Sequence, residues 1–162
     1  MMRQVNFISP TKGRMDLEAL CDDIISYVKT DEESSYRLMI GTDSQVHEEV
    51  CFVTAIIIYR EGKGGRYFYR RFYQKRLPSF KQRIFMEANY SLETASQLVE
   101  LLNMRGLGRL NVEIHLDVGK NGRTREIIKE LVSMITGCGL SAHIKPDSVG
   151  ASSVADRYTK AM

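Results

Sequence analysis

The sequence predicts a single α/β domain over residues 1–162, with a five-stranded mixed sheet of order 3-2-1-4-5, flanking helices and an added N-terminal helix. Strand-length apolar runs come first and then alternate with longer segments of helical periodicity, in the order β-β-β-α-β-α-β-α after the first helix. A meander followed by a right-handed crossover makes the fourth strand parallel to the first and its neighbour. With 43% hydrophobic residues, the 162-residue chain suffices for one domain that buries roughly 70% of its unfolded surface.

The first half of the chain predicts one helix and three strands. Residues 15–30 carry apolar side chains at helical spacing with acidic residues between them, which is typical of an amphipathic helix. Residues 36–43 are too few for a helix and are bounded by turn residues, so they form the first strand. Residues 50–60 are β-branched and apolar on both faces, as in a central strand. After the turn at 61–65, residues 66–76 return as the antiparallel partner.

The second half begins with a long helix. Ser79 and Gln82 have the spacing of a capping box, and helical periodicity follows through the next 25 residues, from 80 to 104. The remaining elements are a strictly alternating strand, a helix ended by glycine, a fifth strand and a short last helix, at residues 110–119, 121–139, 140–146 and 152–162.

Cysteine spacing and hydropathy indicate a soluble cytoplasmic protein without a membrane partner. Cys21, Cys51 and Cys138 are widely spaced in apolar contexts and form no CxxC pair, so we interpret them as reduced core residues. No run reaches the ~18 apolar residues of a membrane span, and the N-terminus has no long apolar segment of a signal peptide.

Two aspartates come at the ends of the predicted parallel strands. Asp43 ends the first strand in GTDSQ, and Asp117 ends the fourth in HLDVG. In open α/β sheets, sites form outside the carboxyl ends of strands where the order reverses, so both carboxylates would stand at one edge. Asp156 is a candidate third ligand, because its helix follows the fifth strand and would pack against that edge. Without Asp117, Asp43 would be interpreted as a turn residue. The alternative for Asp156 is a helix-surface charge paired with Lys160 at i,i+4.

Clustered carboxylates point to hard divalent cations. In a partly buried cleft they repel each other unless one is protonated or a cation lies between them. Mg²⁺ and Mn²⁺ take oxygen ligands, and a site with two ions about 3.5 to 4 Å apart draws carboxylates from several elements. The sequence therefore predicts two Mg²⁺ or Mn²⁺ ions. His47, His115 and His143 lack the spacing of a zinc site, and we interpret His115 as a strand histidine with a structural partner.

The element order, GTDSQ, HLDVG and the AD pair of VADRYTK resemble the ribonuclease H-like superfamily, and more closely the small bacterial YkuK family of predicted nucleases. The resemblance covers essentially the whole chain, including an N-terminal FISPTKG segment that the plain ribonuclease H pattern lacks. It implies that Asp43, Asp117 and Asp156 are catalytic metal ligands. It also implies a fourth carboxylate early in the long helix. Glu87, at the border of that helix's apolar stripe, is favoured over Glu93, whose helical neighbours form a solvated face.

A basic, aromatic-rich segment lies between residues 60 and 83. Lys and Arg side chains contact phosphates, and aromatic rings stack on unpaired bases. The sequence predicts nucleic-acid contacts by Arg70, Arg71, Lys75 and Arg76, with an ordinary strand bearing a solvated face as the alternative.

These features predict an enzyme, a ribonuclease H-like nuclease that uses a two-metal-ion mechanism to hydrolyse a phosphodiester in RNA, an RNA/DNA hybrid or another nucleic acid. The alternative is a non-catalytic nucleic-acid-binding module of the same fold, because a fold alone does not determine function.

Overall fold

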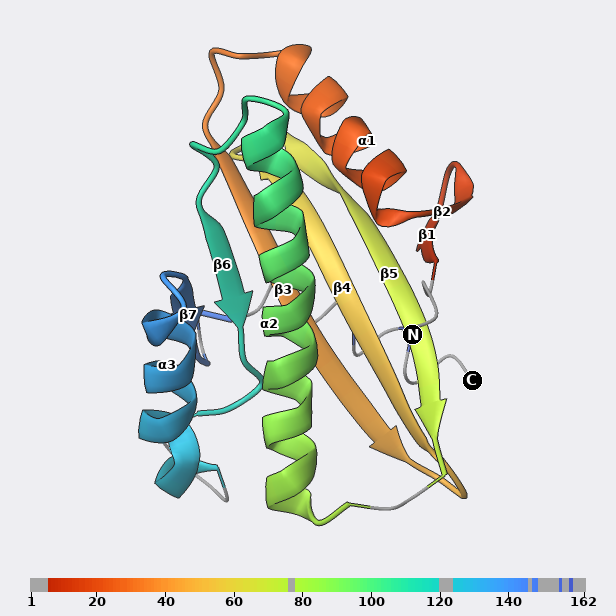
Figure 1. The fold of residues 1–162 in the computed structure, drawn as a ribbon, viewed down its shortest axis with the longest axis vertical. Helices are drawn as coiled ribbons and strands as arrows, with labels where there is room; N and C mark the ends of the chain where they lie inside the picture. The colour runs from red at the N-terminus through yellow and green to blue at the C-terminus, as the bar shows by residue number, and fades with distance from the viewer. Residues whose placement is uncertain are drawn as a thin grey trace.

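The computed structural model describes residues 6–75, 78–119, 124–145, 147, 148, 155 and 158. Helices α1 and α2 lie across one side of the sheet, and α3 lies beside β6 and β7 (Figure 1). The elements in chain order are β1 (Phe7–Ser9), β2 (Gly13–Met15), α1 (Leu17–Lys29), β3 (Tyr36–Val46), β4 (Val50–Arg60), β5 (Gly64–Gln74), α2 (Phe80–Met104), β6 (Val112–His115), the 3₁₀ helix η1 (Arg125–Ile127), α3 (Ile128–Gly137) and β7 (Ser141–His143).

The seven strands have the order β2-β1-β5-β4-β3-β6-β7. Strands β3, β4 and β5 form an antiparallel meander. Strand β6 then pairs in parallel with β3, and β7 pairs in parallel with β6. The order predicted for the five main strands is therefore confirmed by β5-β4-β3-β6-β7.

The prediction of five strands was wrong, because a small hairpin adds β1 and β2 at the β5 edge of the sheet. Ile8 of β1 pairs with Tyr69 of β5, and the hairpin turn at residues 10–12 leads into Gly13, whose φ is 79°. Positive φ at this turn is adopted by glycine without steric cost. Each of these strands has only three residues, which is too short for an alternation pattern to be recognised in the sequence.

Two strand boundaries also differ from the prediction. Strand β3 continues to Val46, so Asp43 lies within the strand and pairs with Val53 of β4 rather than ending the strand. Strand β6 is shorter than predicted and ends at His115, two residues before Asp117. The sequence GTDSQ contains residues typical of turns, but its pairing with the central strand β4 overrides that local preference.

The two faces of the sheet have different coverings. The helical face carries Leu38 and Ile40 of β3, which join side chains of α1, α2 and α3 in one buried cluster. The reverse face carries Asp43 and its cross-strand partner Val53. On that face a smaller buried cluster contains Cys51, Val53, Ala55 and Ala155. The main core thus lies under the helices, and Ala155 and Tyr158 contribute to the reverse face.

The structure also tests the expected burial of the cysteines and the expected absence of a membrane-spanning helix. Cys21 and Cys51 are buried as expected, whereas Cys138 is exposed, because it caps the C-terminal end of α3. Within the ranges described above, no helix combines the length and the apolar character needed to cross a membrane.

Candidate functional site

Asp43 and Asp117 follow the last paired residues of two neighbouring parallel strands. The ladder between β3 and β6 ends with the pair Gly41 and His115. Asp43 lies two residues beyond Gly41 in β3, and Asp117 lies two residues beyond His115. Strand β3 continues past this point and stays paired with β4. Both aspartates therefore come at the position where β3 extends beyond the end of β6.

Glu87 reaches the same region from helix α2. The helix begins with the predicted capping box, in which the Gln82 backbone N–H donates to Ser79 Oγ (3.2 Å) and the Ser79 backbone N–H donates to Gln82 Oε1 (2.9 Å). Two turns later, Glu87 is 8% exposed, and its Oε2 accepts a hydrogen bond of 2.5 Å from Ser44 Oγ. Because Ser44 is the neighbour of Asp43 in β3, this bond brings Glu87 to the strand that carries Asp43.

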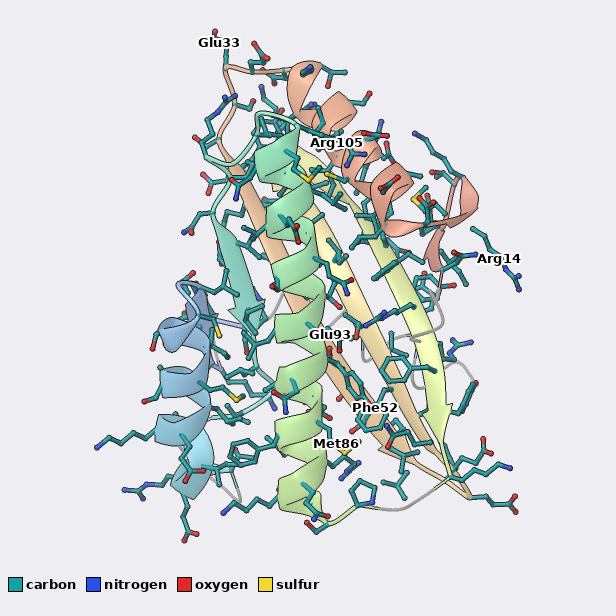
Figure 2. The ribbon with its side chains drawn as sticks, in the orientation of Figure 1. Arg14, Glu33, Phe52, Met86, Glu93 and Arg105 are labelled. Atoms are coloured by element: carbon teal, nitrogen blue, oxygen red, sulfur yellow. The ribbon has the colours of Figure 1, made fainter. Side chains whose placement is uncertain are left out.

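Other contacts fix α2 against the sheet and so fix Glu87. Thr42 Oγ1 lies 2.8 Å from Ser91 Oγ of α2 and 2.9 Å from Thr54 Oγ1 of β4, in a buried chain of hydroxyl groups. Next to it, Phe52 packs beside the N-terminal half of α2 (Figure 2), with its ring centroid 5.1 Å from that of Tyr90. Removing either contact would loosen the helix turn that positions Glu87.

Glu87 is the carboxyl group with the most perturbed environment among the described residues. Burial, with a smaller effect of the negative charges of Asp43 and Asp117, raises its pKa from 4.5 to about 8, against the opposing effects of Ser44 and Arg83. Burial disfavours the charged form, and like charges do the same. The three carboxyl groups therefore form one electrostatic cluster, which gains stability from a proton or a cation.

The two aspartates of this cluster differ in exposure. Asp43 is 7% exposed, on the reverse face. Asp117 is 37% exposed, and its Oδ1 lies 2.7 Å from Lys145 Nζ. An ion pair this exposed contributes little to stability, on the order of 0–1 kcal/mol. Lys145 thus neutralises the exposed side of the cluster. Breaking its ion pair with Asp117 would cost little free energy.

Asp156 lies outside the described residues, but residues on both sides of it are described. Ala155 packs against Val53, the cross-strand partner of Asp43. The ring of Tyr158 stacks on Tyr69 with a centroid separation of 3.7 Å. Ala155 and Tyr158 therefore lie on the reverse face, which also carries Asp43.

The competing helix carboxylate, Glu93, acts on a different part of the molecule. Its charge raises the pKa of Tyr90, whose main perturbation is burial, and opposes the lowering of the Arg70 pKa by burial. The structure thus brings Glu87, rather than Glu93, to the two aspartates.

Two of the four basic residues predicted to contact nucleic acid, Arg70 and Arg71, lie on opposite faces of the sheet. Successive residues of a strand point to opposite faces. Arg70 therefore lies on the helical face, where it donates to Thr94 Oγ1 (3.2 Å), and burial lowers its pKa. Arg71 lies on the reverse face and donates to the Tyr158 carbonyl (2.7 Å). Lys75 is exposed beyond the end of β5, and Arg76 is outside the described residues.

Arg71 and Asp43 share the reverse face. Val53 of β4 pairs with Asp43 on one side and with Arg71 on the other. Both charges act on the Cys51 thiol: burial raises its pKa, Arg71 lowers it and Asp43 raises it. A row of side chains across three strands thus carries a carboxylate at one end and a guanidinium at the other.

Sequence reasoning missed one cluster of metal-binding side chains. Glu113, His115 and His143 come together on the reverse face of β6 and β7, with ligand atoms all within 4.8 Å of one another. The spacing of Glu113 and His115, two residues apart in one strand, was the signal in the sequence that could have indicated this cluster. Recognising it also required the register that pairs His115 with His143, which no single segment reveals.

Comparison with known proteins agrees with this fold. A family model described as "Ribonuclease H-like" matches residues 19–160. The chain is also similar to the "Uncharacterized protein YkuK" of Bacillus subtilis (strain 168), with 37% identity over 166 aligned positions that cover 95% of this chain and 96% of that protein. No solved structure gives a significant match. The chain belongs to the ribonuclease H-like family.

Proposed function

We propose that the protein is a nuclease that hydrolyses phosphodiester bonds in RNA or RNA/DNA hybrids with the help of divalent cations. The observation that carries this proposal is the gathering of Asp43, Glu87 and Asp117 where β3 extends beyond β6, with the Glu87 pKa raised to about 8 by burial and by the two aspartates. Structural carboxylates are normally solvated or paired with a basic group. Three of them together, with Asp43 and Glu87 buried, suit a site that binds a cation.

The donor set fits Mg²⁺ or Mn²⁺. Asp43, Glu87 and Asp117 offer carboxylate oxygens, which are the ligands that these hard ions prefer, and Asp156 would complete the set from the C-terminal segment. When bound, two such ions would activate water and stabilise the charge that develops on the scissile phosphate and its leaving oxygen.

The chain's own groups would prepare this site. Ser44 holds Glu87 Oε2 by its hydrogen bond of 2.5 Å, which fixes the position of the carboxyl group. Burial of Asp43 and Glu87 strengthens their interaction with any positive charge, because the effective dielectric constant is lower there than in water. Lys145, which neutralises Asp117, would be released to contact a substrate phosphate once cations replace it.

For substrate binding, Arg71 is the strongest of the four proposed contacts, since it lies on the same face and in the same row as Asp43. Lys75 and Arg76 would extend the contact beyond the end of β5. Arg70 would act indirectly, by holding β5 against α2 through Thr94.

We expect Arg71→Gln to weaken nucleic-acid binding and to reduce its salt dependence. Each lost phosphate contact lowers the slope of log affinity against log salt by roughly 0.7 to 0.9. Glutamine removes the charge but keeps an N–H donor for the Tyr158 carbonyl. Fluorescence anisotropy over a salt series would measure the slope, with Lys29→Gln, at the exposed C-terminal end of α1, as the matched control. Equal slopes for Arg71→Gln and wild type would contradict the assignment.

The alternative function is a nucleic-acid-binding module that does not cleave. A panel of labelled single-stranded RNA, RNA/DNA hybrid and single-stranded DNA, incubated with Mg²⁺ or Mn²⁺, distinguishes the two. We expect cleavage of RNA or hybrid that stops when EDTA is added. Tight binding without cleavage in either ion would favour the binding module, and absence of both binding and cleavage would reject both functions.

A further inference from the structure

The reverse face carries a Glu-His-His cluster separate from the three carboxylates discussed above. Glu113 Oε1 lies 3.2 Å from His115 Nε2 and 3.3 Å from His143 Nε2. The parallel register pairs His115 directly with His143, and Glu113 comes two residues before His115 on the same face of β6. One carboxylate oxygen and two imidazole nitrogens thus converge on a common point between the last two strands of the sheet.

The spacing of these atoms matches the coordination sphere of a small ion. Zinc ligands in proteins lie about 2.0 to 2.2 Å from the ion, so neighbouring ligand atoms of a tetrahedral site are about 3.4 Å apart. The two separations from Glu113 Oε1, 3.2 and 3.3 Å, fall close to that value. The three ligand atoms lie within 4.8 Å of one another, so the two imidazoles would need to close only around an ion placed beside Glu113 Oε1.

The surroundings hold the ligands in place. Arg37 donates two hydrogen bonds to Glu113, from Nε to Oε2 (2.9 Å) and from a terminal nitrogen to Oε1 (2.6 Å). This fixes the carboxylate as hydrogen-bonding groups around metal ligands usually do. The His115 ring is 2% exposed, and Nε2 is the nitrogen that faces the cluster, 3.2 Å from Glu113 Oε1. Its Nδ1 is buried with no hydrogen-bond partner among the described residues. The His143 side chain is 29% exposed, which leaves the cluster accessible from solvent.

We propose that Glu113, His115 and His143 bind one divalent transition-metal ion of the zinc class. Two imidazoles and one carboxylate favour zinc and similar ions over Mg²⁺, which prefers oxygen ligands. Three protein ligands leave the fourth position of a tetrahedral ion to water. The ion would join β7, which has only three residues, to β6 and so stiffen the edge of the sheet next to Asp117.

This proposal does not depend on nuclease activity. The two sites use different donor sets, nitrogen-rich at the Glu-His-His cluster and all-oxygen at Asp43, Glu87 and Asp117. The competing interpretation is that the histidines only brace the ion pair of Arg37 and Glu113, in which case no ion binds.

Zinc titration of the tag-free, EDTA-treated and dialysed full-length chain tests the proposal. The variants are His143→Gln, which removes the most exposed ligand, and His47→Gln, a matched control in the exposed turn between β3 and β4. Asp43→Asn alters the carboxylate site, so unchanged zinc binding by this variant would show that the zinc does not bind there. Calorimetry with a competing chelator gives stoichiometry and affinity, and the visible absorption of bound Co²⁺ reports whether the site is tetrahedral.

We expect one Zn²⁺ per chain for wild type, His47→Gln and Asp43→Asn. For His143→Gln we expect an affinity at least about 100-fold lower, because even loss of a group that only supports a ligand costs about 10- to 100-fold. Wild type with Co²⁺ should give the intense visible bands of a tetrahedral ion, a result that needs no variant to fold. Unchanged zinc affinity in His143→Gln, or no zinc binding and no such Co²⁺ spectrum in wild type, would overturn the proposal.

Discussion

Asp43→Asn is expected to remove cleavage while leaving nucleic-acid binding nearly intact. Asp43 is the buried aspartate of the cluster, and its charge reaches Glu87 across the interface between β3 and α2. Losing a carboxylate ligand should remove cation-assisted activation of water, which raises the barrier by on the order of several kcal/mol. Turnover at saturating substrate, measured on the RNA and hybrid panel, would give the size of the loss.

The same variant also separates catalysis from folding. Because Asn removes repulsion between like charges, Asp43→Asn without cations should melt at the wild-type temperature or above, and it should lose the stabilisation that Mg²⁺ gives the wild type through binding. Asp22→Asn, an exposed change on α1, is the control and should behave as wild type in both assays. A variant that is stabilised by Mg²⁺ as much as wild type would show that Asp43 is not a ligand.

Glu87→Gln is expected to change the pH dependence of stability in the cation-free protein. Burial, with the charges of Asp43 and Asp117, raises the Glu87 pKa to about 8 in the folded state from 4.5. Between these values the folded chain holds a proton that the unfolded chain releases, so wild-type stability falls as pH rises. The slope is about 1.4 kcal/mol per pH unit at most, and the full effect is on the order of a few kcal/mol.

Gln cannot ionise, so the free energy of unfolding of Glu87→Gln should lack this pH dependence. Its excess over the wild-type value should be near zero below pH 4.5, the pKa of Glu87 in the unfolded chain, and should grow as the pH rises toward 8. Urea unfolding at several pH values with EDTA present would measure this difference. Glu93→Gln is the matched control on the same helix, and its difference from wild type should show no comparable rise. A difference between Glu87→Gln and wild type that stays constant from pH 4.5 to 8 would mean that Glu87 is not held protonated by its surroundings.

The order of the main strands could be predicted from the sequence, because the strand and helix patterns are strong and the handedness rule for crossovers leaves one arrangement. The long apolar strands, the capping box at Ser79 and the right-handed crossover together predicted that β6 lies parallel to β3. That arrangement made Asp43 and Asp117 candidate partners from the sequence alone. The boundaries were less predictable, because the turn-like residues around Asp43 are held in β3 by pairing with β4, which local propensity does not record.

Other features required three-dimensional information. Strands β1 and β2 are too short to produce a periodic signal. The Glu-His-His cluster depends on the register between β6 and β7. By contrast, the separation of Arg70 from Arg71 could have been foreseen, since alternation along a strand sends neighbouring side chains to opposite faces.

Anomalous scattering from crystals soaked in Mn²⁺ would test the proposed active site most directly. Asp43, Glu87 and Asp117 should coordinate the ions, so we expect anomalous peaks in contact with the Asp43 and Asp117 carboxylates. Crystals of Asp43→Asn, soaked in the same way, should lose or weaken these peaks. Clear Mn²⁺ peaks elsewhere on the molecule, with none touching Asp43 or Asp117 in the wild type, would contradict the assignment of this cluster as the catalytic cation site.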